Sequence, residues 1–236
     1  MRRPSLSGDH IARVHRTVPD AGPPPGVRQQ TDADHAGWAA RTFASHPAPD
    51  RPTQLFAYGS LIWKPEIAHA AAEVGVARGW HRAFCLRTHR FRGTAEQPGL
   101  MMALDRGGQC NGVLYTLPRE DLRARLDRLL RREFTVKPIN SMPRWITVQT
   151  AHGPVSALAF VMNRGSPYSA GRLSPEEIAH TLARACGHWG TGAEYLWNTV
   201  THLEARGIRD SGLWRLQRLV AQEIDRVTNG GQTVSR

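Results

Sequence analysis

Long apolar runs, an apolar leader and paired cysteines are all missing from this chain of 236 residues. No stretch of 18 apolar residues occurs, so the sequence predicts no transmembrane helix and no membrane partner. Residues 1–4 carry positive charge, but no apolar segment follows them, so we expect no secretory signal. The length suffices for one sizeable core, with two small domains as the alternative, and the apolar content of 40% is typical of a globular protein.

Cysteine is scarce, with Cys85, Cys110 and Cys186 far apart and odd in number. Neither a Cys-x-x-Cys pair nor a His-Glu-x-x-His motif is present, so the sequence predicts no disulfide framework and no zinc site. Isolated thiols are typical of a reducing compartment, and we expect a cytoplasmic protein.

Lysine is almost absent, although the formal net charge is +11. Only Lys64 and Lys137 are lysines, so 29 of the 31 basic residues (31 minus 2) are arginine. Such one-sided usage is typical of a coding bias rather than of a phosphate-binding face, and we expect no nucleic-acid partner. Binding of RNA or another acidic partner stays an alternative. The densest cluster spreads around one predicted helix and comprises Arg123, Arg125, Arg128, Arg131 and Arg132.

Three regions differ in composition. Residues 1–53 contain many prolines and little that can form a core, so they are interpreted as a mostly disordered extension or a loosely docked arm, dispensable for folding and turnover. Residues 54–227 form the predicted catalytic domain, and residues 228–236 a flexible tail.

Within the predicted domain, strands come first and helices last, which indicates an α+β fold with one antiparallel or barrel-like β-sheet packed with α-helices. The stretch 105–108, Asp-Arg-Gly-Gly, predicts a hairpin turn. Ser174 to Glu177 form a capping box with proline at the first helical position, which predicts a helix start. Predicted strands are 55–58, 73–80, 83–88, 100–105, 112–117, 144–150 and 155–162; predicted helices are 118–133, 175–186, 193–206 and 210–227.

One strand-like run, Leu55 to Tyr58, breaks at Gly59 and Ser60 before the chain turns toward a short helical segment. Backbone N–H groups at such a break have no strand partner and can bind an anion or a carbonyl oxygen together. Glycine lets a ligand approach the main chain closely, and the Ser60 hydroxyl adds a donor. Many Gly-Ser turns are only turns, and that interpretation stays open.

A carboxylate occupies an unusual place on the helix predicted from Pro118. At about 100° per residue, Glu133 falls in the middle of the apolar stripe of that helix. A carboxyl there is desolvated and lies at the negative end of the helix dipole, so we expect a raised pKa, as a general acid or base at neutral pH requires. Alternatively, the helix ends at Arg131 and Glu133 pairs with an arginine. The stripe consists of Leu122, Leu126, Leu129 and Leu130.

Several short motifs occur together in a specific order over residues 54–220. They are Tyr58-Gly59-Ser60-Leu61, Gly79-Trp80-His81-Arg82-Ala83-Phe84, Arg92-Gly93-Thr94, Pro98-Gly99, Asn111-Gly112-Val113-Leu114-Tyr115 and Arg132-Glu133. This series resembles the ChaC-like, glutathione-specific branch of the γ-glutamylcyclotransferases.

The resemblance implies a reaction and a set of site residues. The α-amine of a γ-glutamyl group attacks its own side-chain carbonyl, so that glutathione yields 5-oxoproline and cysteinylglycine without a cofactor. Glu133 is the implied catalytic residue. Separately, Arg82 lies beside a predicted strand and is a candidate anchor for a glutathione carboxylate, although an arginine at a strand start is usually structural. Another γ-glutamyl amine or amino acid remains an alternative substrate. The implied substrate-binding turn comprises Phe56, Ala57, Tyr58, Gly59, Ser60 and Leu61, with Ala57 where the family commonly has glycine.

Overall fold

A computed structural model describes residues 5–229, and these divide into two compact units. One unit contains residues 26–83 and 102–169, and the other contains residues 5–25, 84–101 and 170–229. Most of the predicted tail, from residue 230 on, lies outside the described residues.

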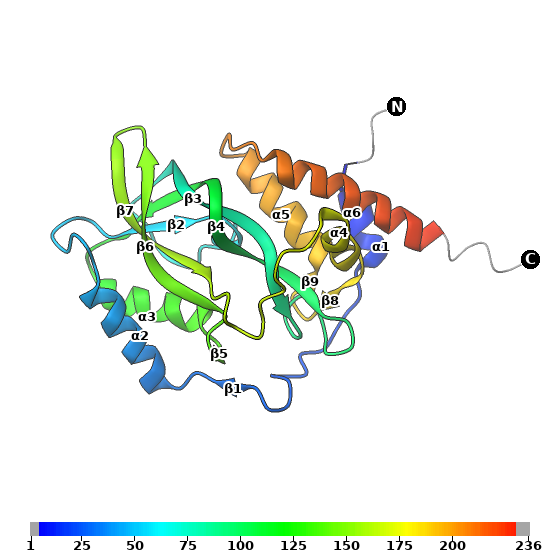
Figure 1. The fold of residues 1–236 in the computed structure, drawn as a ribbon, viewed down its shortest axis with the longest axis horizontal. Coiled ribbons are helices and arrows are strands. Elements are labelled where there is room, and N and C mark those ends of the chain that lie inside the picture. The colour runs from blue at the N-terminus through cyan, green and yellow to red at the C-terminus, as the bar shows by residue number, and fades with distance from the viewer. Residues whose placement is uncertain (1–4, 230–236) are drawn as a thin grey trace, which may run out of the picture. The chain divides into compact units, whose positions relative to one another are not determined.

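Five strands form a closed barrel in the order β2-β4-β3-β6-β7 (Figure 1). Neighbours pair antiparallel, as in Phe56 with Leu114 and Trp145 with Leu158, whereas β7 also pairs parallel with β2 and β4. The predicted α+β fold with a barrel-like sheet is therefore confirmed, with parallel pairs in addition. The strands are β2 (Gln54–Ala57), β3 (Ala71–Thr88), β4 (Gly99–Thr116), β6 (Ser141–Thr150) and β7 (Gly153–Met162).

The hairpin turn predicted at 105–108 is wrong, because β4 continues through it as one strand of 18 residues. Gly107 and Gly108 have φ values of 105° and 65°. Glycine adopts such angles without a Cβ clash, so the pair bends the strand instead of reversing it. Nδ1 of His81 on β3 lies 3.1 Å from the Gly107 carbonyl oxygen. The reversal between β3 and β4 falls instead at 89–98.

The first unit also contains α2 (Asp32–Ala44), η1 (Ser60–Ile62), α3 (Leu122–Glu133), and the short strands β1 (Arg28–Gln29) and β5 (Val136–Lys137). Helix α2 lies against α3 (Figure 1) and begins at a capping box between Thr31 and Asp34. Helix α3 starts at Leu122, later than predicted, because residues 119–121 form a turn in which Asp121 has a φ of 54°.

Residues 5–53 therefore contain two helices, which differs from the mostly disordered extension that the proline content predicts. His35 and Thr42 on α2 are buried, so one face of this helix is covered despite its modest apolar content. The domain boundary at residue 54 stays a prediction.

The second unit is mainly helical. Its core includes Leu182, Leu196 and Val220, and the Arg92 guanidinium is buried against the Glu194 carboxylate at 2.5 Å. The capping box predicted at Ser174 is confirmed. The elements are α1 (Gly8–Val14), α4 (Pro175–Arg184), β8 (Cys186–Gly187), β9 (Gly190–Thr191), α5 (Gly192–Glu204) and α6 (Ser211–Asn229). Among the described residues, no helix combines the length and apolarity needed to cross a membrane.

Replacement of Gly112 tests the contact between β2 and β4. A Cβ at this position would lie 2.5 Å from the Ala57 carbonyl oxygen and 2.6 Å from the Phe56 ring. Because backbone cannot move aside cheaply, Gly112→Ala should lower the melting temperature by about 3–10 °C in calorimetry. Gly165→Ala is the matched control, since its Cβ would meet only Asn163 at 3.6 Å. Equal melting temperatures for the two variants would contradict the tight packing.

Candidate active site

The Gly-Ser break after β2 forms a single 3₁₀ turn, η1. The first hydrogen bond of this turn runs from the Ile62 N–H to the Gly59 carbonyl at 2.9 Å. The N–H groups of Gly59, Ser60 and Leu61 come before it and therefore have no acceptor within the turn. Gly59 has φ −139° and ψ −128°, which is neither helical nor extended backbone. The turn can therefore present main-chain donors to a ligand.

Two tyrosine hydroxyls connect the ends of this turn with strands of the barrel. The Tyr58 hydroxyl donates to the Phe160 carbonyl at 2.7 Å, and the Tyr115 hydroxyl donates to the Ile62 carbonyl at 3.4 Å. Both rings are buried. The turn is thus attached to rigid strands on either side, as a preorganised binding loop requires.

The other predicted binding residues contribute in different ways. Phe56 and Ala57 are fully buried, so their side chains face the protein interior and only their main chain can meet a ligand. The methyl group of Ala57 therefore does not narrow an exposed part of the turn. Nε of Arg82 donates to the Tyr58 carbonyl at 3.1 Å, and its Nη2 donates to the Asn111 carbonyl. Arg82 supports the turn from β3, and anchoring of a substrate carboxylate by it stays a prediction.

Glu133 is the last residue of α3, and its side chain is 21% exposed. Leu126, Leu129 and Leu130 of the same helix are buried, as the apolar stripe predicts. The helix reaches Glu133, as the first interpretation of the sequence predicts. Glu133 also lies 3.4 Å from Nε of Arg132, which is the arginine contact of the alternative interpretation. Burial raises the pKa of Glu133 to about 6, against an opposing effect of Arg132. A group with this pKa can take and return a proton near neutrality.

Arg132 connects Glu133 with the turn, a link that the sequence did not reveal. Its Nη2 donates to the Ser60 hydroxyl at 3.4 Å, and its Nη1 donates to the Lys64 carbonyl and, at 3.0 Å, to Glu66. The guanidinium therefore spans the end of α3 and residues 60–66. Its position next to Glu133 in the sequence is the one signal that could have drawn attention to it.

Glu66 adds a negative charge to this cluster. Burial opposes its ionisation, but bonds from Lys64 at 3.1 Å and from Arg132 outweigh that effect, and the pKa of Glu66 is below its ordinary value. This charge raises the pKa of Glu133 further. The pKa of Glu133 thus reflects burial and Glu66 acting against Arg132.

The arginine cluster of α3 is largely occupied by partners within the chain. Arg131 contacts Asp127 at 2.7 Å and Asp32 at 2.5 Å, while Arg132 faces residues 60–66. Arg123 lies over the Phe43 ring, and Arg125 donates to the Glu120 carbonyl. These contacts give the arginines a structural explanation and weaken the case for an acidic macromolecular partner.

A closed barrel with a strand-end turn of this kind is the fold of the γ-glutamylcyclotransferases. The structure of the yeast γ-glutamyl cyclotransferase specific to glutathione matches with a TM-score of 0.65, covering 72% of this chain and 96% of the yeast chain. At 17% identity this likeness shows the fold alone. The family model described as ChaC-like protein matches residues 53–223, and the chain belongs to the ChaC-like family.

Two curated relatives carry the same functional name. The glutathione-specific γ-glutamylcyclotransferase of Escherichia coli (strain K12) is 39% identical over 175 residues, 74% of each chain. The mouse glutathione-specific γ-glutamylcyclotransferase 1 is 30% identical over 193 residues, covering 78% of this chain and 81% of the mouse protein.

The raised pKa of Glu133 predicts how Glu133→Gln changes stability with pH. The native state keeps the proton to about pH 6, whereas the unfolded chain releases it near 4.5, so ionisation destabilises the native protein as the pH rises through this window. The cost at pH 7 is about 2 kcal/mol. Glutamine carries no such cost, so the melting temperature of the variant relative to wild type should rise by several degrees between pH 4 and pH 7. A difference that is independent of pH would contradict the raised pKa.

Proposed function

We propose that this protein is a glutathione-specific γ-glutamylcyclotransferase that uses Glu133 to move a proton during cyclisation. The observation that carries the proposal is a carboxyl with a pKa of about 6, joined through Arg132 to a turn whose first N–H groups have no acceptor within it. The names of the Escherichia coli and mouse relatives support glutathione as the substrate.

The turn binds the γ-glutamyl part of the substrate. Main-chain N–H groups of Gly59, Ser60 and Leu61 donate to its carboxylate or to the oxyanion that forms at the side-chain carbonyl. Tyr58 and Arg82 act indirectly, because their bonds to the barrel and to the turn keep these donors in place. Holding the γ-glutamyl chain bent can lower the barrier by up to ~7–11 kcal/mol.

Cyclisation exchanges one C–N bond for another. Glu133 accepts a proton from the α-ammonium, and the free amine attacks the side-chain carbonyl carbon of the same γ-glutamyl group. The new bond closes the ring of 5-oxoproline, and the bond to the leaving nitrogen breaks. Glu133 returns its proton to that nitrogen, which departs as the amine of cysteinylglycine, and the ring nitrogen gives up its second proton to this amine. The nucleophile belongs to the substrate, so the protein needs to supply only the proton shuttle and the binding turn.

We also propose a cytoplasmic location. Cys85, Cys110 and Cys186 are buried and form no disulfide with one another. Reduced thiols are typical of proteins in reducing compartments, which supports this location.

Incubation with three substrates tests the reaction and its specificity. We expect 5-oxoproline and cysteinylglycine from glutathione, and at least about 100-fold lower kcat/KM with γ-glutamylalanine and γ-glutamyl-lysine, because specificity of this size needs contacts beyond the γ-glutamyl part. Equal turnover of γ-glutamylalanine would move the proposal to a broader cyclotransferase. Absence of 5-oxoproline from all three would refute it.

Glu133→Gln separates binding from proton transfer. Glutamine keeps the volume of the side chain but cannot take a proton, so kcat should fall by about 10²–10⁴. Glutathione should still bind, as measured by calorimetry, because the turn at 58–61 is unchanged. Ser60→Ala is the control, since it leaves the main-chain donors in place and should cost less. Turnover like that of the wild type in Glu133→Gln would remove this residue from the mechanism.

A further inference from the structure

The segment that follows Glu133 is bound by residues 28–44, here called the arm, which precede the stretch matched by the family model. Strand β1 pairs with β5, with Arg28 opposite Lys137 and Gln29 opposite Val136. Gln30 continues this pairing, because its N–H donates to the Thr135 carbonyl at 3.2 Å and its Nε2 to the Val136 carbonyl at 2.8 Å. The arm thus holds the main chain only two residues after Glu133.

Side chains of α2 extend the same contact. The Trp38 ring packs edge-on against Phe134, with centroids 5.4 Å apart. Phe134 is fully buried and caps α3 directly after Glu133, its N–H donating to the Leu130 carbonyl at 2.8 Å. Phe134 also packs edge-on against Phe160, whose carbonyl accepts the Tyr58 hydroxyl. Trp38 therefore supports the residue that connects the end of α3 with the strand anchoring the turn.

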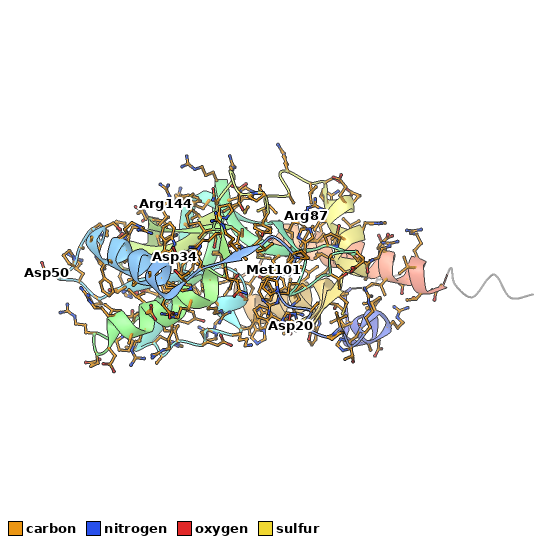
Figure 2. All side chains as sticks on the ribbon, turned by 90° about the horizontal axis from the view of Figure 1, so that it is seen from below. Asp20, Asp34, Asp50, Arg87, Met101 and Arg144 are labelled. Carbon is orange, nitrogen blue, oxygen red and sulfur yellow. The ribbon has the colours of Figure 1, made fainter. Side chains whose placement is uncertain are left out.

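Two ion pairs connect α2 with residues before and after Glu133. The Asp34 carboxylate, near the start of α2 and labelled in Figure 2, contacts the Lys137 ammonium. Asp32 contacts Arg131 at 2.5 Å. Asp32 is largely exposed, so its pair contributes little, whereas Asp34 and Lys137 are both about 30% exposed.

We infer that the arm is a positioning element for the proposed catalytic carboxyl: Trp38 and β1 hold residues 133–137 and exclude water from Glu133. This rests on the proposed function and reverses the expectation that the extension is dispensable. Trp38 and Phe160 both pack edge-on against the fully buried Phe134, so loss of the Trp38 ring opens space beside the end of α3 that water can fill.

The loss of Trp38 can be detected through the pKa of Glu133, which depends on the charged groups around this carboxyl. Arg132 and Glu66 are the charged groups that shift its pKa, in opposite directions. The arm's own charged and titratable groups are not among those that shift it. They are Arg28 on β1, Asp32 paired with Arg131, Asp34 paired with Lys137, His35, whose pKa is lowered by burial, and Arg41, whose guanidinium lies over the Trp38 ring at 4.2 Å.

Trp38→Ala in the full chain tests the inference. We expect kcat for glutathione to fall about 10-fold or more, because a small displacement of a catalytic group is costly, while KM stays within about 3-fold. The acidic limb of the pH profile of kcat/KM should move to lower pH, since hydration favours the ionised carboxyl. Trp38→Phe keeps an aromatic ring against Phe134 and should restore both parameters.

Trp145→Phe is the matched control. The Trp145 indole N–H donates to the Thr42 carbonyl at 3.3 Å, about one helical turn after Trp38 on α2. Loss of this bond weakens docking of the arm without touching the segment after Glu133, so the melting temperature should fall with the pH profile unchanged. An equal shift of the profile in Trp145→Phe would show that general loosening, not Trp38, is responsible, and would overturn the inference.

Failures of the two proposals are distinguishable. If wild type does not form 5-oxoproline from glutathione, the proposed function fails; if wild type is active and Trp38→Ala keeps its kcat and pH profile, only the positioning role fails. If Trp38→Ala does not fold, Asp34→Asn tests another contact of the arm with the same segment, because asparagine keeps an oxygen for the helix cap but weakens the bond to Lys137. A decrease of about 2–3-fold in kcat with the same direction of pH shift supports the inference, and unchanged values overturn it.

Discussion

The Arg132 guanidinium joins two parts of the chain that are 66 to 72 residues apart, the end of α3 and residues 60–66. Arginine suits this place because its planar group donates in several directions while keeping its charge. Here it meets a hydroxyl, a main-chain carbonyl and two carboxylates. Without it, Glu133 and Glu66 would face each other as like charges, and the turn after β2 would lose its link to the helix.

Two opposing electrostatic effects act on Glu133, and their balance fits the proposed chemistry. Complete burial without a cation would keep the carboxyl protonated at neutral pH and prevent it from acting as a base. Full exposure beside an arginine would keep it ionised and make it a poor acid. Partial burial beside Arg132 and Glu66 gives a pKa of about 6, between these extremes.

Local patterns predicted the parts of this architecture that depend on local chemistry. The leucine stripe of α3 identified the face on which Glu133 lies, and the capping box at Ser174 identified the start of α4. The parallel pairs of β7 and the long course of β4 were missed, because they depend on pairing between distant strands and on glycines that bend a strand as readily as they end it. In the candidate site, residue types singled out the turn and Glu133 but left purely structural roles open, and the resemblance to the family favoured the functional ones. The contacts of Arg132 and Trp38 were not, since nothing in their surroundings in the sequence indicates which distant residues they meet.

The path of the chain has a consequence for the way this protein can be divided. The backbone passes from one compact unit to the other four times, at residues 25–26, 83–84, 101–102 and 169–170, and two of these crossings fall inside β3 and β4. Neither unit corresponds to one uninterrupted piece of coding sequence. A fragment containing the barrel residues alone would lack part of β3 and part of β4. The two units must therefore be synthesised and inherited together, as one chain.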